Sequence, residues 1–233
     1  MNKDLKEKFA FTLGATHVGI FHNTRRVGFT LAEVLITLGI IGIVSAMTIP
    51  TLVKNYEKQN TISTLKKAYS TINRAVMNRL IDIEHISFNL SSIEQIEKYW
   101  APYLKIASIE PYSDNSDTNE FYYDMLGNQI WQPNTNFRRA TFTLYDGIRY
   151  TIEKINSEDQ IILADINGKK APNKFGKDVF LFLLDLRTNS LSPYGFQLSD
   201  DEINSSCNAN GDGQFCASKI IKSGWQIKDD YPW

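Results

Sequence analysis

Glu33 is the only ionisable side chain in the most apolar stretch of the chain, FTLAEVLITLGIIGIVSAMTI, which runs from Phe29 to Ile49. A carboxylate at mid-depth of a membrane helix costs about 2.5–3.5 kcal/mol, so such a residue normally has a functional role or a cationic partner. This stretch supplies no cation of its own. Cleavage between Gly28 and Phe29 would create one, because the new α-amino group would lie four residues before Glu33, about one helical turn away.

The apolar stretch itself admits three interpretations. A helix of this length would span about 31 Å, enough to cross a hydrocarbon layer of about 30 Å. A buried helix of a soluble protein would be unusually apolar on all sides. A discarded secretory signal, cut near Val44-Ser45-Ala46, has a shorter apolar region and no reason to carry a carboxylate. The sequence therefore favours a membrane anchor that the mature protein retains.

Residues 25–50 combine several features that together resemble the signal of type IV prepilins and of type II secretion pseudopilins. Gly28-Phe29-Thr30-Leu31-Ala32-Glu33 precedes the apolar run, and Pro50 would be the twenty-second residue of a chain cut after Gly28. The resemblance implies cleavage after Gly28 by a membrane-bound prepilin peptidase, followed by methylation of the Phe29 amine. It also implies that Glu33 pairs with the N-terminal amine of a neighbouring subunit during filament assembly.

The resemblance also implies where the parts of the chain lie. The leader would be cytoplasmic, and the C-terminal head would lie on the periplasmic or extracellular side of a single-pass inner membrane anchor. The expected partners are prepilin peptidase, other pilin or pseudopilin subunits and the membrane. The overall charge of -1 divides into +3 on residues 1–28 and -4 on the remainder, so no nucleic acid is expected as a partner.

Beyond the apolar run, the sequence predicts an α+β, pilin-like fold. Apolar residues at steps of three and four predict that the helix continues as an amphipathic helix to about Ile83, with a kink at Pro50. Ser91-Ser92-Ile93-Glu94 predicts the start of a short helix that ends near Trp100. Alternating runs joined by Asp146-Gly147 predict a β-hairpin over residues 141–152, and residues 160–166 and 179–186 read as two more strands. Together these elements predict a roughly four-stranded antiparallel sheet that packs on the long helix.

These elements divide the chain into four predicted parts: a leader at residues 1–28, a transmembrane and assembly helix at 29–50, its amphipathic continuation at 51–84, and a globular head at 85–233. The last stretch of the head, from Cys207 to Trp233, shows little regular pattern.

The cysteine pair and one oxygen-rich loop are the remaining candidate sites. Cys207 and Cys216 are the only cysteines, and their spacing suits a local disulfide loop in an oxidising compartment; the alternative is two reduced thiols. The resemblance implies a C-terminal disulfide loop of this kind. Asn208, Asn210 and Asp212 resemble the start of a calcium loop, although Lys219 stands where a closing glutamate would be. Asp165-Ile166-Asn167-Gly168 reads better as a turn after a strand.

The sequence therefore predicts a structural subunit, not an enzyme, of a type IV pilus or a type II secretion-type filament. Removal of the leader would take His17 and His22 with it and leave His85 as the only histidine, and paired cysteines offer no nucleophile. No cofactor is expected, with calcium as a minority hypothesis. The alternative is an unprocessed, single-pass, membrane-anchored binding domain outside the cytoplasm. Pilus, secretion and DNA-uptake systems, and major or minor subunits, remain open.

Overall fold

The computed structural model describes residues 28–82, 92–110, 121–131, 139–156 and 158–233. Residues up to Ile49 form one compact unit and Pro50–Trp233 form another, and each is described by itself. Several predictions concern residues outside the described ranges: the leader over residues 1–27, the exact helix end at Ile83, His85, and Ser91 of the predicted cap.

One helix, α1 (Leu31–Asp82), contributes to both units, and Pro50 lies inside it. The helix assignment continues through the proline, and the kink stays a prediction. In the second unit, α1 buries a stripe of apolar side chains at steps of three and four, in agreement with the amphipathic pattern. The buried members of this stripe are Ile62, Leu65, Ala68, Ile72, Ala75 and Val76.

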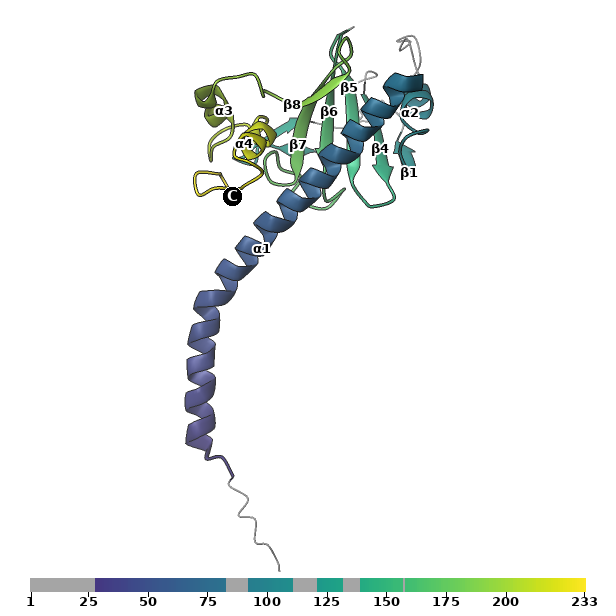
Figure 1. The fold of residues 1–233 in the computed structure, drawn as a ribbon. Coiled ribbons are helices and arrows are strands. Elements are labelled where there is room, and N and C mark those ends of the chain that lie inside the picture. The colour runs from purple at the N-terminus through teal and green to yellow at the C-terminus, as the bar shows by residue number, and fades with distance from the viewer. Residues whose placement is uncertain (1–27, 83–91, 111–120, 132–138, 157) are drawn as a thin grey trace, which may run out of the picture. The chain divides into compact units, whose positions relative to one another are not determined.

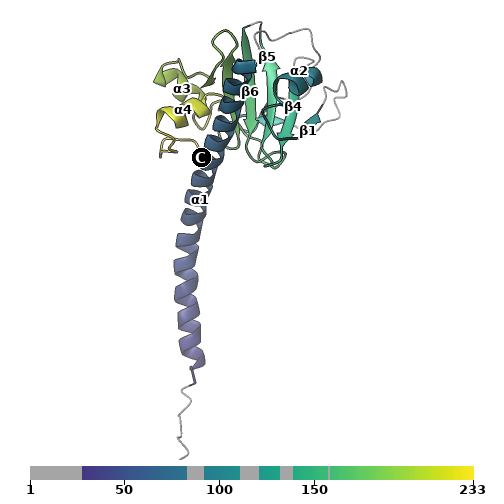
Figure 2. The same ribbon diagram turned by 45° about the vertical axis from the view of Figure 1, so that its right-hand side comes forward.

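The apolar stripe of α1 packs across a six-stranded antiparallel sheet with the order β1-β4-β5-β6-β7-β8 (Figures 1 and 2). The strands are β1 (Ile106–Glu110), β4 (Arg139–Leu144), β5 (Arg149–Lys154), β6 (Asp159–Asp165), β7 (Val179–Asp185) and β8 (Ser190–Pro193). The predicted long helix, hairpin and antiparallel sheet are confirmed. The four predicted strands are the central ones, and β1 and β8 extend the sheet by one strand at each edge.

Two tyrosine hydroxyls fix α1 on the sheet. Tyr150 of β5 is fully buried, and its hydroxyl donates to the backbone carbonyl of Ala68 at 3.1 Å. Tyr69 of α1 donates to the carbonyl of Leu191 in β8 at 3.1 Å. Helix and sheet are therefore joined by directional bonds as well as by apolar burial, which alone is not directional.

The other face of the sheet carries a second, smaller core. It consists of Tyr122, Leu163, Phe175, Val179 and Leu181. The small hairpin of β2 (Tyr122–Tyr123) and β3 (Gln129–Trp131) supplies Tyr122, and the β6–β7 connection supplies Phe175. Backbone bonds join Tyr123 to Asn173 and Phe175, so hairpin and connection form one cover over this face.

Three short helices complete the head: α2 (Ser92–Tyr99), α3 (Asp200–Ser206) and α4 (Cys216–Lys222). The first agrees with its predicted position. The segment after Cys207, in which the sequence shows little regular pattern, contains the short helix α4. Helix α3, just before it, begins with a full capping box in which Ser199 and Glu202 bond reciprocally. Ser-x-x-Glu is a sequence signal of such a start.

Arg79 is the one buried cation on the described part of α1. Its side chain is 2% exposed, its guanidinium lies 4.8 Å from the ring centre of Trp100, and it donates to Asn189 at 3.4 Å. No carboxylate of the described residues pairs with it, and burial lowers its pKa to about 10. Its long stem and its stacking on Trp100 attach the end of α1 to the residues that follow α2.

We predict that Arg79 contributes to the stability of the head mainly through packing and less through its charge. Arg79→Ala should lower the free energy of unfolding by about 2–4 kcal/mol because it leaves a cavity beneath Trp100. Arg79→Met keeps the stem without the desolvated charge and should cost about 1 kcal/mol or less. Urea denaturation of the detergent-solubilised chain measures both. Equal losses in the two variants would show that the charge itself is required.

Candidate functional site

The chain enters α1 through an N-terminal capping box built from Thr30 and Glu33. The Thr30 backbone N–H and its hydroxyl both donate to Glu33 Oε2 at 2.8 Å, and the Glu33 N–H donates to Thr30 Oγ1 at 3.2 Å. Thr-x-x-Glu is the sequence signature of this arrangement. The signature was present in the sequence but the cap was not predicted, because the carboxylate was considered only as a partner for a charge.

This geometry gives Glu33 a polar partner within its own chain. A carboxylate in the first turn is also favoured by the positive end of the helix dipole. Both bonds are accepted by Oε2, and no donor among the described residues contacts Oε1. Oε2 therefore holds the helix start, and Oε1 accepts no bond from the described residues. Gly28 and Phe29 precede this cap outside the helix and are exposed, Phe29 at 87%.

The helix after this cap presents large apolar side chains on all sides. Before Pro50, the most exposed of them, at 58% or more, are Leu31, Leu35, Ile36, Leu38, Ile40, Ile41, Ile43 and Met47. The helix is long and apolar enough to cross a membrane, and none of its most apolar stretch is buried within the protein. Exposure of such a continuous apolar surface marks an interaction site or a membrane segment.

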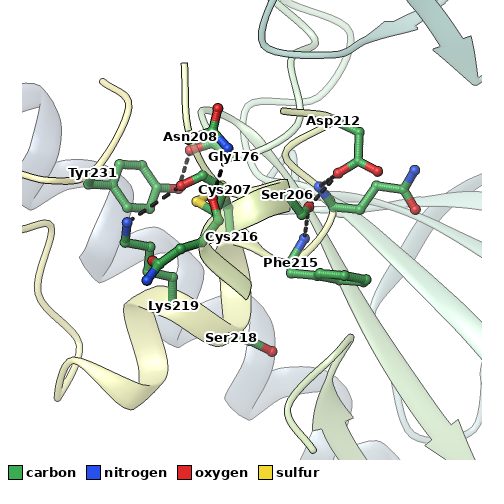
Figure 3. Close-up of a disulfide and its surroundings, with 12 residues drawn as sticks. Gly176, Ser206, Cys207, Asn208, Asp212, Phe215, Cys216, Ser218, Lys219 and Tyr231 are labelled. Atoms are coloured by element: carbon green, nitrogen blue, oxygen red, sulfur yellow. Dashed lines mark hydrogen bonds between the residues drawn. A yellow bond between two sulfur atoms is a disulfide. The ribbon is translucent and has the colours of Figure 1, made fainter. Parts of the chain in front are cut away.

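The predicted disulfide is confirmed. Cys207 and Cys216 are bonded, fully buried, and 5.0 Å apart at their Cα atoms (Figure 3). The bond joins the end of α3 to the start of α4. Gly176, from the β6–β7 connection, approaches so closely that a Cβ there would lie 2.7 Å from the Sγ of Cys216. The Tyr231 hydroxyl donates to the Gly176 carbonyl. Both Cys216 and Tyr231 of the C-terminal segment thus contact Gly176 of the β6–β7 connection.

The calcium candidates Asn208, Asn210 and Asp212 lie in the loop closed by this disulfide. The Asn208 side chain accepts from the Asn210 N–H at 2.8 Å and donates to two carbonyls at the end of α3. Asp212 accepts from the Gln214 N–H at 3.0 Å and from the Ser206 hydroxyl. These bonds are those of turn-forming side chains. Among the described residues, no group of three or more His, Cys, Asp or Glu side chains is placed to hold a metal ion.

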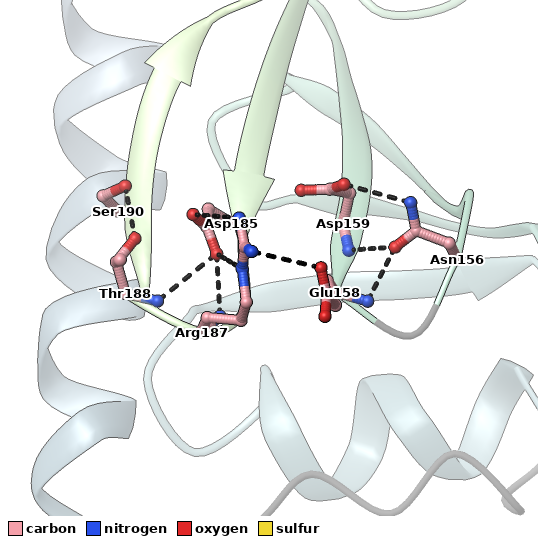
Figure 4. A network of polar contacts seen from close by, with 7 residues as sticks. All are labelled: Asn156, Glu158, Asp159, Asp185, Arg187, Thr188 and Ser190. Atoms are coloured by element: carbon pink, nitrogen blue, oxygen red, sulfur yellow. Dashed lines mark hydrogen bonds and ion pairs between the residues drawn. The ribbon is translucent and has the colours of Figure 1, made fainter.

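Other polar side chains gather at the turns of the sheet. Arg187 bonds Glu158 at 3.2 Å and Asp185 at 3.4 Å, and Asn156 and Asp185 accept from the backbone N–H groups of their own turns (Figure 4). Arg187 and Glu158 are more than half exposed. Exposed ion pairs of this kind contribute about 0–1 kcal/mol. These contacts therefore stabilise two turns, and we do not consider this cluster a candidate functional site.

Asp165 ends β6, and the turn predicted after it is present: the Asn167 N–H bonds its carboxylate at 3.3 Å. The carboxyl group is fully buried and accepts from the Tyr122 hydroxyl at 3.2 Å. Arg149, buried beside it, forms an ion pair with Glu110. Burial, and the nearby carboxylate of Asp178, raise the pKa of Asp165 to about 8. The sequence did not predict this buried cluster, because its members come from four separate segments.

This raised pKa predicts a pH-dependent stability. The folded state holds a proton on Asp165 that the unfolded chain, with a pKa near 3.8, releases more readily. The stability that this proton contributes is therefore full below about pH 4 and is lost as the pH rises toward 8. Asp165→Asn, which stays neutral, should flatten this part of the stability curve. Urea midpoints between pH 5 and pH 8.5 measure it, and parallel curves for the two proteins would contradict the assignment.

The capped apolar helix followed by an antiparallel sheet defines a pilin-like arrangement that carries a prepilin-type signal. Comparison with protein families supports the prepilin-type signal. The model of the prokaryotic N-terminal methylation motif matches residues 25–49. A second model, described as a family of unknown function (DUF6613), matches residues 51–233. Because this match covers most of the chain, the chain belongs to the DUF6613 family. Neither the curated proteins nor the solved structures gave a significant match.

Proposed function

We propose that this protein is a structural subunit of a type IV pilus or a type II secretion-type filament. The observation that carries the proposal is the Glu33 carboxylate, held by Thr30 in the first turn of an exposed apolar helix, inside a matched methylation motif. Prepilin peptidase cuts between Gly28 and Phe29 and methylates the Phe29 amine. Residues 1–28 are the leader, residues 29–50 the anchor, and residues 51–84 the helix that carries the head at 85–233.

The chemistry of assembly follows from the cost of an unpaired charge in lipid. Cleavage places an α-amino cation at Phe29 of each subunit. The Oε1 atom of Glu33 accepts no hydrogen bond from the described residues of its own subunit. In a low-dielectric surrounding, a cation and a carboxylate at hydrogen-bond distance attract far more strongly than in water. A neighbouring subunit that supplies its amine to Oε1 removes two unpaired charges in one contact. The pair therefore fixes the axial position of one helix against the next.

The head has a different role in this proposal. Its core is complete without a partner, with the stripe of α1, both faces of the sheet and the disulfide all buried. It lies outside the cytoplasm, where a disulfide persists. Subunit contacts through the anchor are then independent of the surface that the head presents.

We predict that charge at position 33, and not helix capping, is what assembly requires. Glu33→Ala removes both the cap and the charge, whereas Glu33→Gln keeps a side chain that can complete the capping box. Both variants should be cleaved and inserted like the wild type, and both should lose filament incorporation by tenfold or more, an effect of about 1.4 kcal/mol or more. Incorporation is measured in sheared filament fractions against total mature protein.

Thr30 supplies the matched controls. Thr30→Ser keeps the hydroxyl cap, and Thr30→Val removes it while leaving the Glu33 charge in place. Both should incorporate better than Glu33→Gln. If Glu33→Gln assembles like the wild type while Thr30→Val does not, the cap and not the charge carries assembly, and the proposed pairing is wrong.

A further inference from the structure

Residues 51–60 of α1, which we call the collar, belong neither to the apolar anchor nor to the part of the helix that the head buries. They follow the apolar run, which ends at Ile49, and precede Thr61 and Ile62, the first residues that the head buries. All ten are exposed except Lys58, which is half-buried. The collar thus lies between the apolar stretch of α1 and the part of α1 that packs on the sheet.

The collar carries the residue types that suit a membrane surface. Leu52 and Tyr56 are 70% and 71% exposed, and their positions four apart place them on one side of the helix. Lys54 and Lys58, also four apart, occupy the other side, and neither ammonium group pairs with a carboxylate among the described residues. Glu57 is the one acidic residue of the collar. Tyrosine is enriched at membrane interfaces, and lysine attracts anionic headgroups.

Helix geometry brings both lysines within reach of the headgroup layer. At about 1.5 Å per residue, Lys54 and Lys58 lie about 7.5 and 13.5 Å beyond Ile49 along the helix, and a headgroup layer is about 5–7.5 Å thick. Helical side chains lean toward the N-terminus of the helix, which here is the side of the anchor. A lysine stem adds about 6 Å in that direction, so that both ammonium groups can contact lipid phosphates.

We propose that this collar binds the headgroups of anionic phospholipids in the leaflet on the head side of the membrane, through Lys54 and Lys58, with Tyr56 at the same level. The proposal rests on the proposed membrane anchoring of residues 29–50. It assigns the collar a lipid partner in the unassembled subunit. Transfer of the subunit into a filament then requires that these phosphate contacts be released, so the collar opposes departure of single subunits from the membrane.

The test measures lipid selectivity of the full chain in phosphatidylcholine vesicles by electron paramagnetic resonance, with trace spin-labelled phosphatidylglycerol or phosphatidylcholine. The wild type should bind the phosphatidylglycerol probe more strongly, and added salt should weaken this preference. The double variant Lys54→Gln, Lys58→Gln should lower the ratio of association constants by at least fivefold, the effect of about one lysine at a membrane surface. The basic leader contributes equally to all variants.

The matched control is the double variant Arg74→Gln, Lys105→Gln, which removes the same charge from exposed positions of the head and should leave the ratio unchanged. An unchanged ratio in the collar variant, or an equal loss in both variants, overturns the collar proposal. Cross-linking of Asn55→Cys copies at high lipid excess without a phosphatidylglycerol preference also overturns it, in favour of a second copy of the chain. If neither probe is motionally restricted, the anchor itself is absent and the proposed function fails instead.

Discussion

The Glu33 carboxylate must keep a partner at every stage of the protein's existence, because an unpaired charge in an apolar helix is costly. The structure provides the first partner, Thr30, whose backbone N–H and hydroxyl both donate to the carboxylate at the start of α1. These bonds leave Oε1 available. In the proposed function, a neighbouring amine becomes the second partner after cleavage at Gly28. In that proposal the site lies within one short stretch of chain, from Gly28 to Glu33.

One helix meets two kinds of surroundings, and its sequence changes accordingly. Before Pro50, apolar side chains are exposed on every side of α1. From Leu65 to Val76, only one stripe is apolar, and it is buried against the sheet. Tyr150 and Tyr69 bond the helix to strands on either side of the sheet centre. The disulfide joins the end of α3 to the start of α4, and the Tyr231–Gly176 bond attaches the C-terminal segment to the β6–β7 connection.

Local patterns predicted the long helix, α2, the hairpin of β4 and β5, and strands β6 and β7, because each carries its own periodicity or turn signal. Edge strands β1 and β8 were not predicted, since they are short, partly exposed and paired with distant residues. The same limit applies to the buried group of Asp165, Tyr122 and Arg149, whose members meet only in the folded chain. At the site, the resemblance to prepilins implied the roles of Gly28, Phe29 and Glu33, which stay predictions, whereas the Thr30 cap was missed although its signature was present.

The central claim is that the chain is cut to expose Phe29 as the charge partner of Glu33. Mass spectrometry of the N-terminal peptide of the protein, isolated from the membranes of cells that contain prepilin peptidase, tests it most directly. The expected peptide begins at Phe29 and carries one methyl group on its α-amine. A chain that still begins at Met1 would contradict the claim, and so would one cut after Ala46, which would lack Glu33 altogether.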